Sequence, residues 1–129
     1  MCFTFSKKER ITSEKRVETL FSDGQSFVAY PLRVVFLKME PTKDLPAVSI
    51  LISVPKKRIK RAVHRNRLKR LIRETYRLNK HLIDAKDCRL DISFIYVKDE
   101  LSDYATIEKG MKKALSGLTQ QIEKQQNQC

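Results

Sequence analysis

Cysteine is scarce in this sequence, and no hydrophobic run is long. Cys2, Cys88 and Cys129 are odd in number and widely spaced, which fits neither a disulfide framework nor a CxxC-type zinc site. We therefore expect reduced thiols, as in the cytoplasm, and no metal site. The apolar start, residues 1–5, is too short for a signal-peptide core, and no run approaches the length that spans a bilayer. These absences predict a cytoplasmic protein that does not interact with membranes.

Histidines and clustered carboxylates are also scarce, which bears on catalysis. A protein nuclease needs carboxylates grouped around metal ions, or a poised general acid and base. The two histidines, His64 and His81, both lie among cations. Asp84, Asp87 and Asp91 are loosely spaced, and we expect them to cap, turn or solvate. The sequence thus predicts no catalytic residue, with a nuclease in its own right as the alternative hypothesis.

Acidic residues are nearly absent from one stretch. Residues 56–80 read KKRIKRAVHRNRLKRLIRETYRLNK and contain twelve Lys or Arg but a single acid, Glu74. This stretch carries +11 of the formal net charge of +12, because the rest of the chain holds fifteen basic and fourteen acidic side chains. The charge is local, so we expect its partner to contact it locally.

The apolar patterns predict one α+β domain over residues 1–129, with 41% hydrophobic residues to form its core. Branched and aromatic runs indicate strands, and apolar residues three or four apart indicate helices. The predicted order is α-β-β-β-α-β-α, in two layers with the helices on one side of the sheet. Three helices are expected, at residues 11–24, at about 58–78 and from Ser102 or Asp103 onward, and the tail after Glu123 is expected to fray. Four strands are expected, at residues 27–30, 32–39, 47–54 and 90–97.

Two features of the strands suggest how they pair. Pro31 should end or bend the first strand, so that 27–30 and 32–39 form an antiparallel pair around it. The run 47–54, AVSILISV, is mainly apolar and is expected inside the sheet. The succession of strand, long helix and strand suggests a βαβ crossover.

The long helix should present two different faces. Steps of about 100° per residue place Leu68, Leu71, Ile72, Thr75 and Leu78 on the core side. The opposite side carries cations three or four residues apart, whose repulsion only Glu74 offsets. A polyanion would compensate this repulsion, so we interpret the face as a phosphate-binding surface rather than a solubilising one. The cations are Arg58, Arg61, Arg65, Lys69, Arg70, Arg73 and Arg77.

Charge alone does not identify the nucleic acid. Seven of the twelve cations are Arg, which favours forked contacts to phosphate and stacking on bases. A basic helix enters the major groove of DNA but not that of an A-form RNA duplex. A DNA-binding helix protein and a ribosomal-protein-like RNA-binding module therefore both remain alternatives at this point.

Residues 62–74, AVHRNRLKRLIRE, contain an RNR triplet followed by KR and RE. This segment resembles the protein subunit of bacterial ribonuclease P. The likeness extends over most of the chain: residues 11–27 resemble the first helix of that family, 52–57 resemble its strand leading into a Lys-Lys pair, and the strand near Ile92 and the closing helix follow in the same order.

The resemblance implies both a fold and a function. The fold has a left-handed βαβ crossover around the RNR helix, against the general preference for right-handed crossovers. The function is to join a catalytic RNA in the ribonucleoprotein that removes the 5′ leader from precursor tRNA. In that family the RNA positions Mg²⁺ and performs the hydrolysis, so the protein supplies no catalytic residue, and no obligate protein partner is expected.

The resemblance also implies which residues contact RNA. The signature triplet is Arg65, Asn66 and Arg67. Pro55 replaces a usual Ser before the Lys-Lys pair, and the approach to the helix is lengthened by one basic residue. The expected contacts to the catalytic RNA are Lys56, Lys57, Lys60, Arg61, Arg65, Asn66, Arg67, Lys69, Arg70 and Arg73.

The family binds the single-stranded leader in a cleft between the first helix and the sheet, where aromatic side chains stack on bases. The corresponding residues are Val17, Phe21 and Val35. Val17 and Val35 replace aromatic residues that are usual there, so stacking should be weaker, and Phe21 is equally consistent with a core position. Substitutes for the missing rings could come from Phe27, Tyr30 or Phe36.

Overall fold

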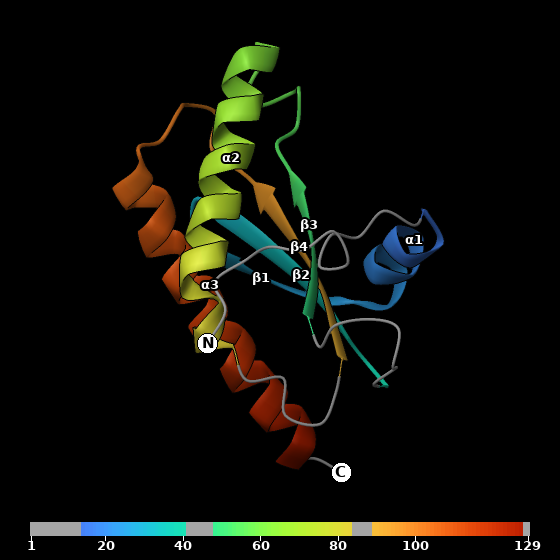
Figure 1. The fold of residues 1–129 in the computed structure, drawn as a ribbon. Coiled ribbons are helices and arrows are strands. Elements are labelled where there is room, and N and C mark those ends of the chain that lie inside the picture. Colours follow the sequence, from blue (N-terminus) through green and yellow to red (C-terminus); the bar gives the residue numbers. More distant parts are fainter. Residues whose placement is uncertain (1–13, 41–47, 84–88, 128–129) are drawn as a thin grey trace.

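A computed structural model describes residues 14–40, 48–83 and 89–127. It confirms the α+β class and the predicted order of helices and strands, with a short 3₁₀ turn added after the long helix (Figure 1). The start of the first predicted helix, most of the loop 40–46, all three cysteines, Asp84 and Asp87 lie outside the described residues. The elements are α1 (Glu14–Asp23), β1 (Gln25–Ala29), β2 (Leu32–Met39), β3 (Val48–Ser53), α2 (Ala62–Asn79), η2 (Lys80–Leu82), β4 (Arg89–Tyr96) and α3 (Tyr104–Asn127).

The four strands form one sheet in the order β1-β2-β4-β3. β1 and β2 pair antiparallel around the turn at Tyr30 and Pro31, as predicted, and β2 is antiparallel to β4. β3 and β4 are parallel. The prediction that 47–54 lies inside the sheet is wrong, because β3 is an edge strand and β4 is central. β3 is the more apolar of the two in sequence, but it is β4 that is buried along almost its whole length.

The connection from β3 through α2 to β4 is left-handed. In Figure 1 the chain rises along β3, nearest the viewer, descends through α2 to the left of the sheet and rises again along β4 behind β3. Strand, helix and strand in succession would by general preference form a right-handed path. The hand implied by the family resemblance is therefore confirmed.

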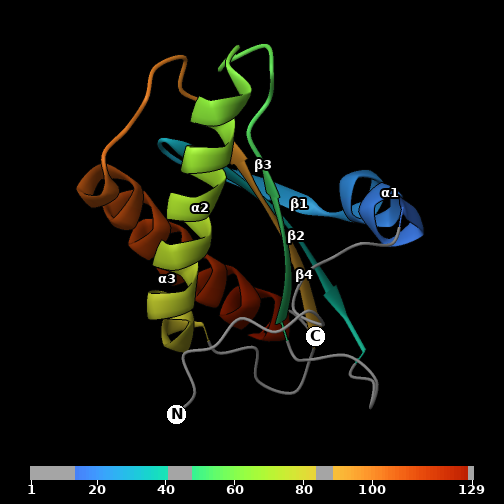
Figure 2. The same ribbon diagram turned by 45° about the horizontal axis from the view of Figure 1, so that its top comes forward.

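Helices lie on both faces of the sheet, unlike the predicted single layer (Figure 1 and Figure 2). α2 and α3 cover one face, where Val34 and Phe36 of β2 join the main core. α1 lies on the other face, where Leu20 packs against Val35. The physical reason is that β2 has apolar side chains on both faces, so its second face also requires a cover.

The boundaries and faces of the helices differ in detail from the prediction. α2 begins at Ala62 rather than near Arg58. Its buried residues are Leu68, Ile72, Thr75, Tyr76 and Asn79, whereas Leu71 is half-buried and Leu78 is exposed. α3 buries the predicted face and continues as a helix to Asn127, past the tail expected to fray. The buried residues of that predicted face are Ile107, Met111, Ala114, Leu115 and Leu118.

Candidate nucleic-acid interface

The segment before α2, which we call the basic loop (residues 55–61), has a fixed shape. The Pro55 carbonyl oxygen accepts hydrogen bonds from the backbone N–H of Arg58 at 3.0 Å and of Ile59 at 3.1 Å. Ile59 is buried and anchors the loop to the core. Lys56 and Lys57 are exposed at the tip of this turn, so both point their charges outward from a constrained backbone.

Arg65 connects α2 to the basic loop. Its guanidinium donates hydrogen bonds to the carbonyl oxygens of Ile59 at 3.1 Å and Lys60 at 2.7 Å. The N-cap residue of α2, Arg61, forms no side-chain cap, so the contacts from Arg65 supply part of the polar attachment between helix and loop. The first arginine of the RNR triplet thus stabilises the loop that carries four of the other predicted contacts, Lys56, Lys57, Lys60 and Arg61.

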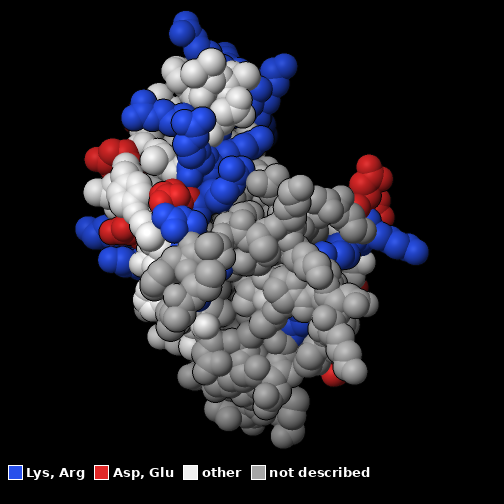
Figure 3. Space-filling view, viewed as in Figure 1, with Lys and Arg blue, Asp and Glu red and all other residues white. Residues whose placement is uncertain are grey.

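The remaining predicted RNA contacts form one surface, which we call the cationic face. Lys60, Arg61, Asn66, Arg67, Arg70 and Arg73 are exposed and Lys69 is half-buried. Figure 3 shows Lys and Arg gathered over α2 on one side of the molecule. Within residues 14–40, 48–83 and 89–127, no ion pair neutralises a cation of this face. The repulsion between them is therefore left for a polyanion to offset.

Two arginines of the predicted cationic side are paired with acids. Arg77 binds Glu74 through two hydrogen bonds, one of them 3.3 Å long from Nε to Oε2, and the hydrogen bond from Arg77 lowers the pKa of Glu74. Arg58 pairs with Asp99 at 3.1 Å. These pairs partly neutralise Arg58 and Arg77, so we exclude both residues from the cationic face.

The three residues predicted for the leader cleft lie at α1 and the sheet face beneath it, but in different environments. Val17 and Val35 belong to one small apolar cluster with Leu20, Leu37, Leu51 and Ile95, and Val35 is 6% exposed. Phe21 is 48% exposed, so the structure does not bring it into that cluster. Of the three side chains, Phe21 is the most exposed.

The suggested substitutes for the missing aromatic residues do not lie beside Val35. Phe36 is buried in the main core and makes an edge contact with Phe27 at 6.0 Å between ring centroids. Both rings therefore lie on the α3 side of the sheet, opposite α1. Tyr30 is 60% exposed at the β1–β2 turn. The expectation that Phe27 or Phe36 replaces the cleft aromatics is wrong, because alternate residues of a strand face opposite sides.

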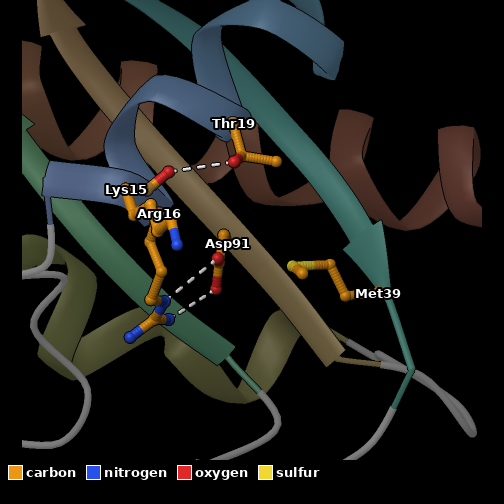
Figure 4. Close-up of a pocket in the computed structure, with 5 residues that line it drawn as sticks. All are labelled: Lys15, Arg16, Thr19, Met39 and Asp91. Carbon is orange, nitrogen blue, oxygen red and sulfur yellow. Dashed lines mark hydrogen bonds and ion pairs between the residues drawn. The ribbon is translucent and has the colours of Figure 1, made fainter.

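A buried ion network lies under α1, and the sequence did not reveal it. Asp91, expected to cap or solvate, is 1% exposed and accepts hydrogen bonds at 2.7 Å from both Arg16 and Arg89. A cavity of about 170 Å³ adjoins this network. Figure 4 shows Arg16 reaching from α1 to Asp91 on β4. The cavity is lined by Lys15, Arg16, Thr19, Met39 and Asp91.

The described helices include none that is both long enough and apolar enough to cross a membrane. In the same part of the chain, no three His, Cys, Asp or Glu side chains are grouped as they would be around a metal ion.

Comparison with known proteins identifies relatives over most of the chain. The family model described as ribonuclease P matches residues 5–119. The ribonuclease P protein component of Porphyromonas gingivalis is 45% identical over 117 residues, covering 88% of this chain and 85% of the relative. The component from Chlorobium phaeobacteroides is 40% identical over 76 residues, covering 57% of this chain and 52% of the relative.

Solved structures agree with this relationship. The ribonuclease P protein from Thermotoga maritima is 26% identical with a TM-score of 0.68, covering 84% of this chain and 96% of that chain. The protein from Staphylococcus aureus is also 26% identical, with a TM-score of 0.64 and coverage of 83% and 92%. The RNR triplet lies on an exposed helix, and the crossover that contains this helix is left-handed. Together with the matches above, these features show that the chain belongs to the ribonuclease P protein family.

Proposed function

We propose that this chain is the protein component of a bacterial ribonuclease P, which removes the 5′ leader of precursor tRNA. The observation that carries this proposal is the cationic face on α2, whose charges have no partner among the described residues. A cationic surface without acids is suited to bind the phosphate backbone of a folded RNA. Because the chain belongs to the ribonuclease P protein family, we infer that this RNA is the catalytic RNA of ribonuclease P.

The two faces of the sheet have separate roles in this proposal. The cationic face and the basic loop bind the catalytic RNA. The opposite face, beside α1, binds the single-stranded leader, with exposed Phe21 available for stacking on a base. A protein that binds both RNAs holds the leader near the catalytic RNA and so favours substrate with a leader over mature tRNA.

Hydrolysis is assigned to the RNA partner. The RNA subunit, with Mg²⁺ bound to it, supplies the catalytic chemistry, and the cations of this chain reduce the repulsion between the phosphates of catalytic RNA and substrate. This division predicts that the protein matters most when Mg²⁺ is too dilute to screen the phosphates alone. We place the reaction in the cytoplasm.

Reconstitution tests the proposal. The protein is combined with the ribonuclease P RNA of a related bacterium, and 5′ cleavage of precursor tRNA is measured at low and high Mg²⁺. We expect cleavage at low Mg²⁺ to require both components, and high Mg²⁺ to reduce the requirement for protein. Protein freed exhaustively of RNA is the control, and cleavage by it would assign catalysis to the chain. Equal cleavage with and without protein at low Mg²⁺ would contradict the proposed role.

A further inference from the structure

Within residues 14–40, 48–83 and 89–127, few side chains attach α1 to the sheet. It has ten residues, and Leu20 is the one that is fully buried among them. Val17 adds a partly buried contact in the same small cluster. Among the residues that the structure describes, apolar packing therefore holds this helix only over its middle, and any polar attachment nearby contributes a large share of what fixes its position.

The ion network under α1 provides such an attachment. Arg16 Nη2 lies 2.7 Å from Asp91 Oδ1 and Arg16 Nε lies 3.4 Å from Asp91 Oδ2, so the guanidinium contacts both carboxylate oxygens. The Arg16 side chain is 20% exposed and that of Asp91 is 1% exposed. Charge-assisted, forked contacts with little access to water are among the stronger and more directional polar interactions. Arg16 thereby joins α1 to the central strand β4 (Figure 4).

Asp91 retains a second partner when Arg16 is removed. Arg89 Nη1 lies 2.7 Å from the same carboxylate oxygen, and the Arg89 side chain is 5% exposed. A buried charge that loses its last partner is strongly destabilising, but here Arg89 keeps Asp91 paired. Loss of Arg16 should therefore loosen α1 while the sheet stays folded.

Arg16 precedes Val17, one of the two residues of α1 predicted for the leader cleft, and it lines the cavity between α1 and the ends of β2 and β4. We propose that Arg16 is a positioning residue: by binding Asp91 it fixes the distance between α1 and the sheet, and so the shape of the leader site. This inference rests on the proposed function. Because valines replace the usual aromatic residues at two cleft positions of this chain, stacking is weaker and leader affinity depends on that fixed shape.

The test compares two variants that remove the same charge from neighbouring positions. Arg16→Met breaks the contact to Asp91, whereas Lys15→Met removes an exposed cation that lines the same cavity and has no side-chain partner in the part of the chain that the structure describes. Each variant is reconstituted with the catalytic RNA. The dissociation constant is then measured for precursor tRNA and for mature tRNA, which lacks the leader.

We expect Arg16→Met to weaken binding of precursor tRNA about tenfold and Lys15→Met about twofold or less. Binding of mature tRNA should change little in both. Arg16→Lys, which keeps the charge but loses the fork, should fall between Arg16→Met and the unaltered chain. Equal losses in the two Met variants would show that only charge matters and would overturn the inference.

Hydrogen exchange of the RNA-free protein separates positioning from a general loss of stability. In Arg16→Met we expect faster exchange of the α1 amides and unchanged exchange in β4. If β4 exchanges faster by the same factor, or if the variant does not fold, Arg16 is a general structural residue and the proposal is wrong. If the unaltered holoenzyme binds precursor and mature tRNA equally, the leader role itself fails, which is a different result.

Discussion

Two arginines of the RNR triplet make different contacts. Arg65 donates to two carbonyl oxygens of the basic loop, whereas Arg67 is exposed. We expect Arg65→Ala to release the loop, since hydrogen bonds that involve a charged group are each worth about 1.5–3 kcal/mol. Trypsin should then cleave the RNA-free variant faster after Lys56, Lys57 and Lys60. Affinity for the catalytic RNA should fall by more than one lost charge explains.

Arg67→Ala is the matched control for this prediction. It removes the same charge two residues further along α2, so affinity should fall while the rate of trypsin cleavage in the loop stays unchanged. Identical proteolysis of the two variants would mean that Arg65 does not hold the loop in solution.

At the scale of elements, α3 begins with a capping aspartate. The Thr106 backbone N–H donates to Asp103 Oδ1 at 2.9 Å, and the hydrogen bonds from Thr106 lower the pKa of Asp103. Because the pKa is lower in the folded state, the cap stabilises the protein above the unfolded pKa, near 4, and this contribution is lost as pH falls through the folded pKa. Asp103→Ala should lower the melting temperature at pH 7 by roughly 3–6 °C.

Asp103→Asn distinguishes the cap from the charge. Asparagine is also a good N-cap, so this variant should melt close to the unaltered protein at pH 7. The difference in melting temperature between Asp103→Ala and the unaltered protein should shrink below pH 4. A difference that is constant from pH 7 to pH 3 would contradict a role for the ionised carboxylate.

The elements were largely predictable from sequence because each has a local signal, such as the alternation in β4 or the face of α3. The arrangement of these elements in the fold was less predictable. The edge position of β3 and the placement of α1 depend on which apolar faces meet. The residue pattern of one strand does not specify which strand or helix packs against it. Asp91 illustrates the same limit at the site, because its partner Arg16 lies 75 residues away in sequence.

At the scale of the molecule, charge is concentrated on one side. Binding to the catalytic RNA should weaken steeply with salt, because each Lys or Arg that contacts a phosphate releases counterions. Replacing Arg70 or Arg73 by Ala should reduce the slope of log affinity against log salt by about 1. Arg77→Ala should leave the slope nearly unchanged, because Arg77 is paired with Glu74. If the slope is the same for all three variants, the cationic face does not contact the catalytic RNA.

The sheet remains open until late in synthesis. β4 joins β2 to β3, yet it begins at Arg89, after both of those strands and all of α2 have been made. Until β4 leaves the ribosome, α2 lacks the completed sheet against which Leu68 and Ile72 are buried. Pairing between strands far apart in sequence is slow. The nascent chain therefore carries the cations of residues 56–80 before its sheet is complete, and synthesis of residues 89–127 is the step that completes the support for the cationic face.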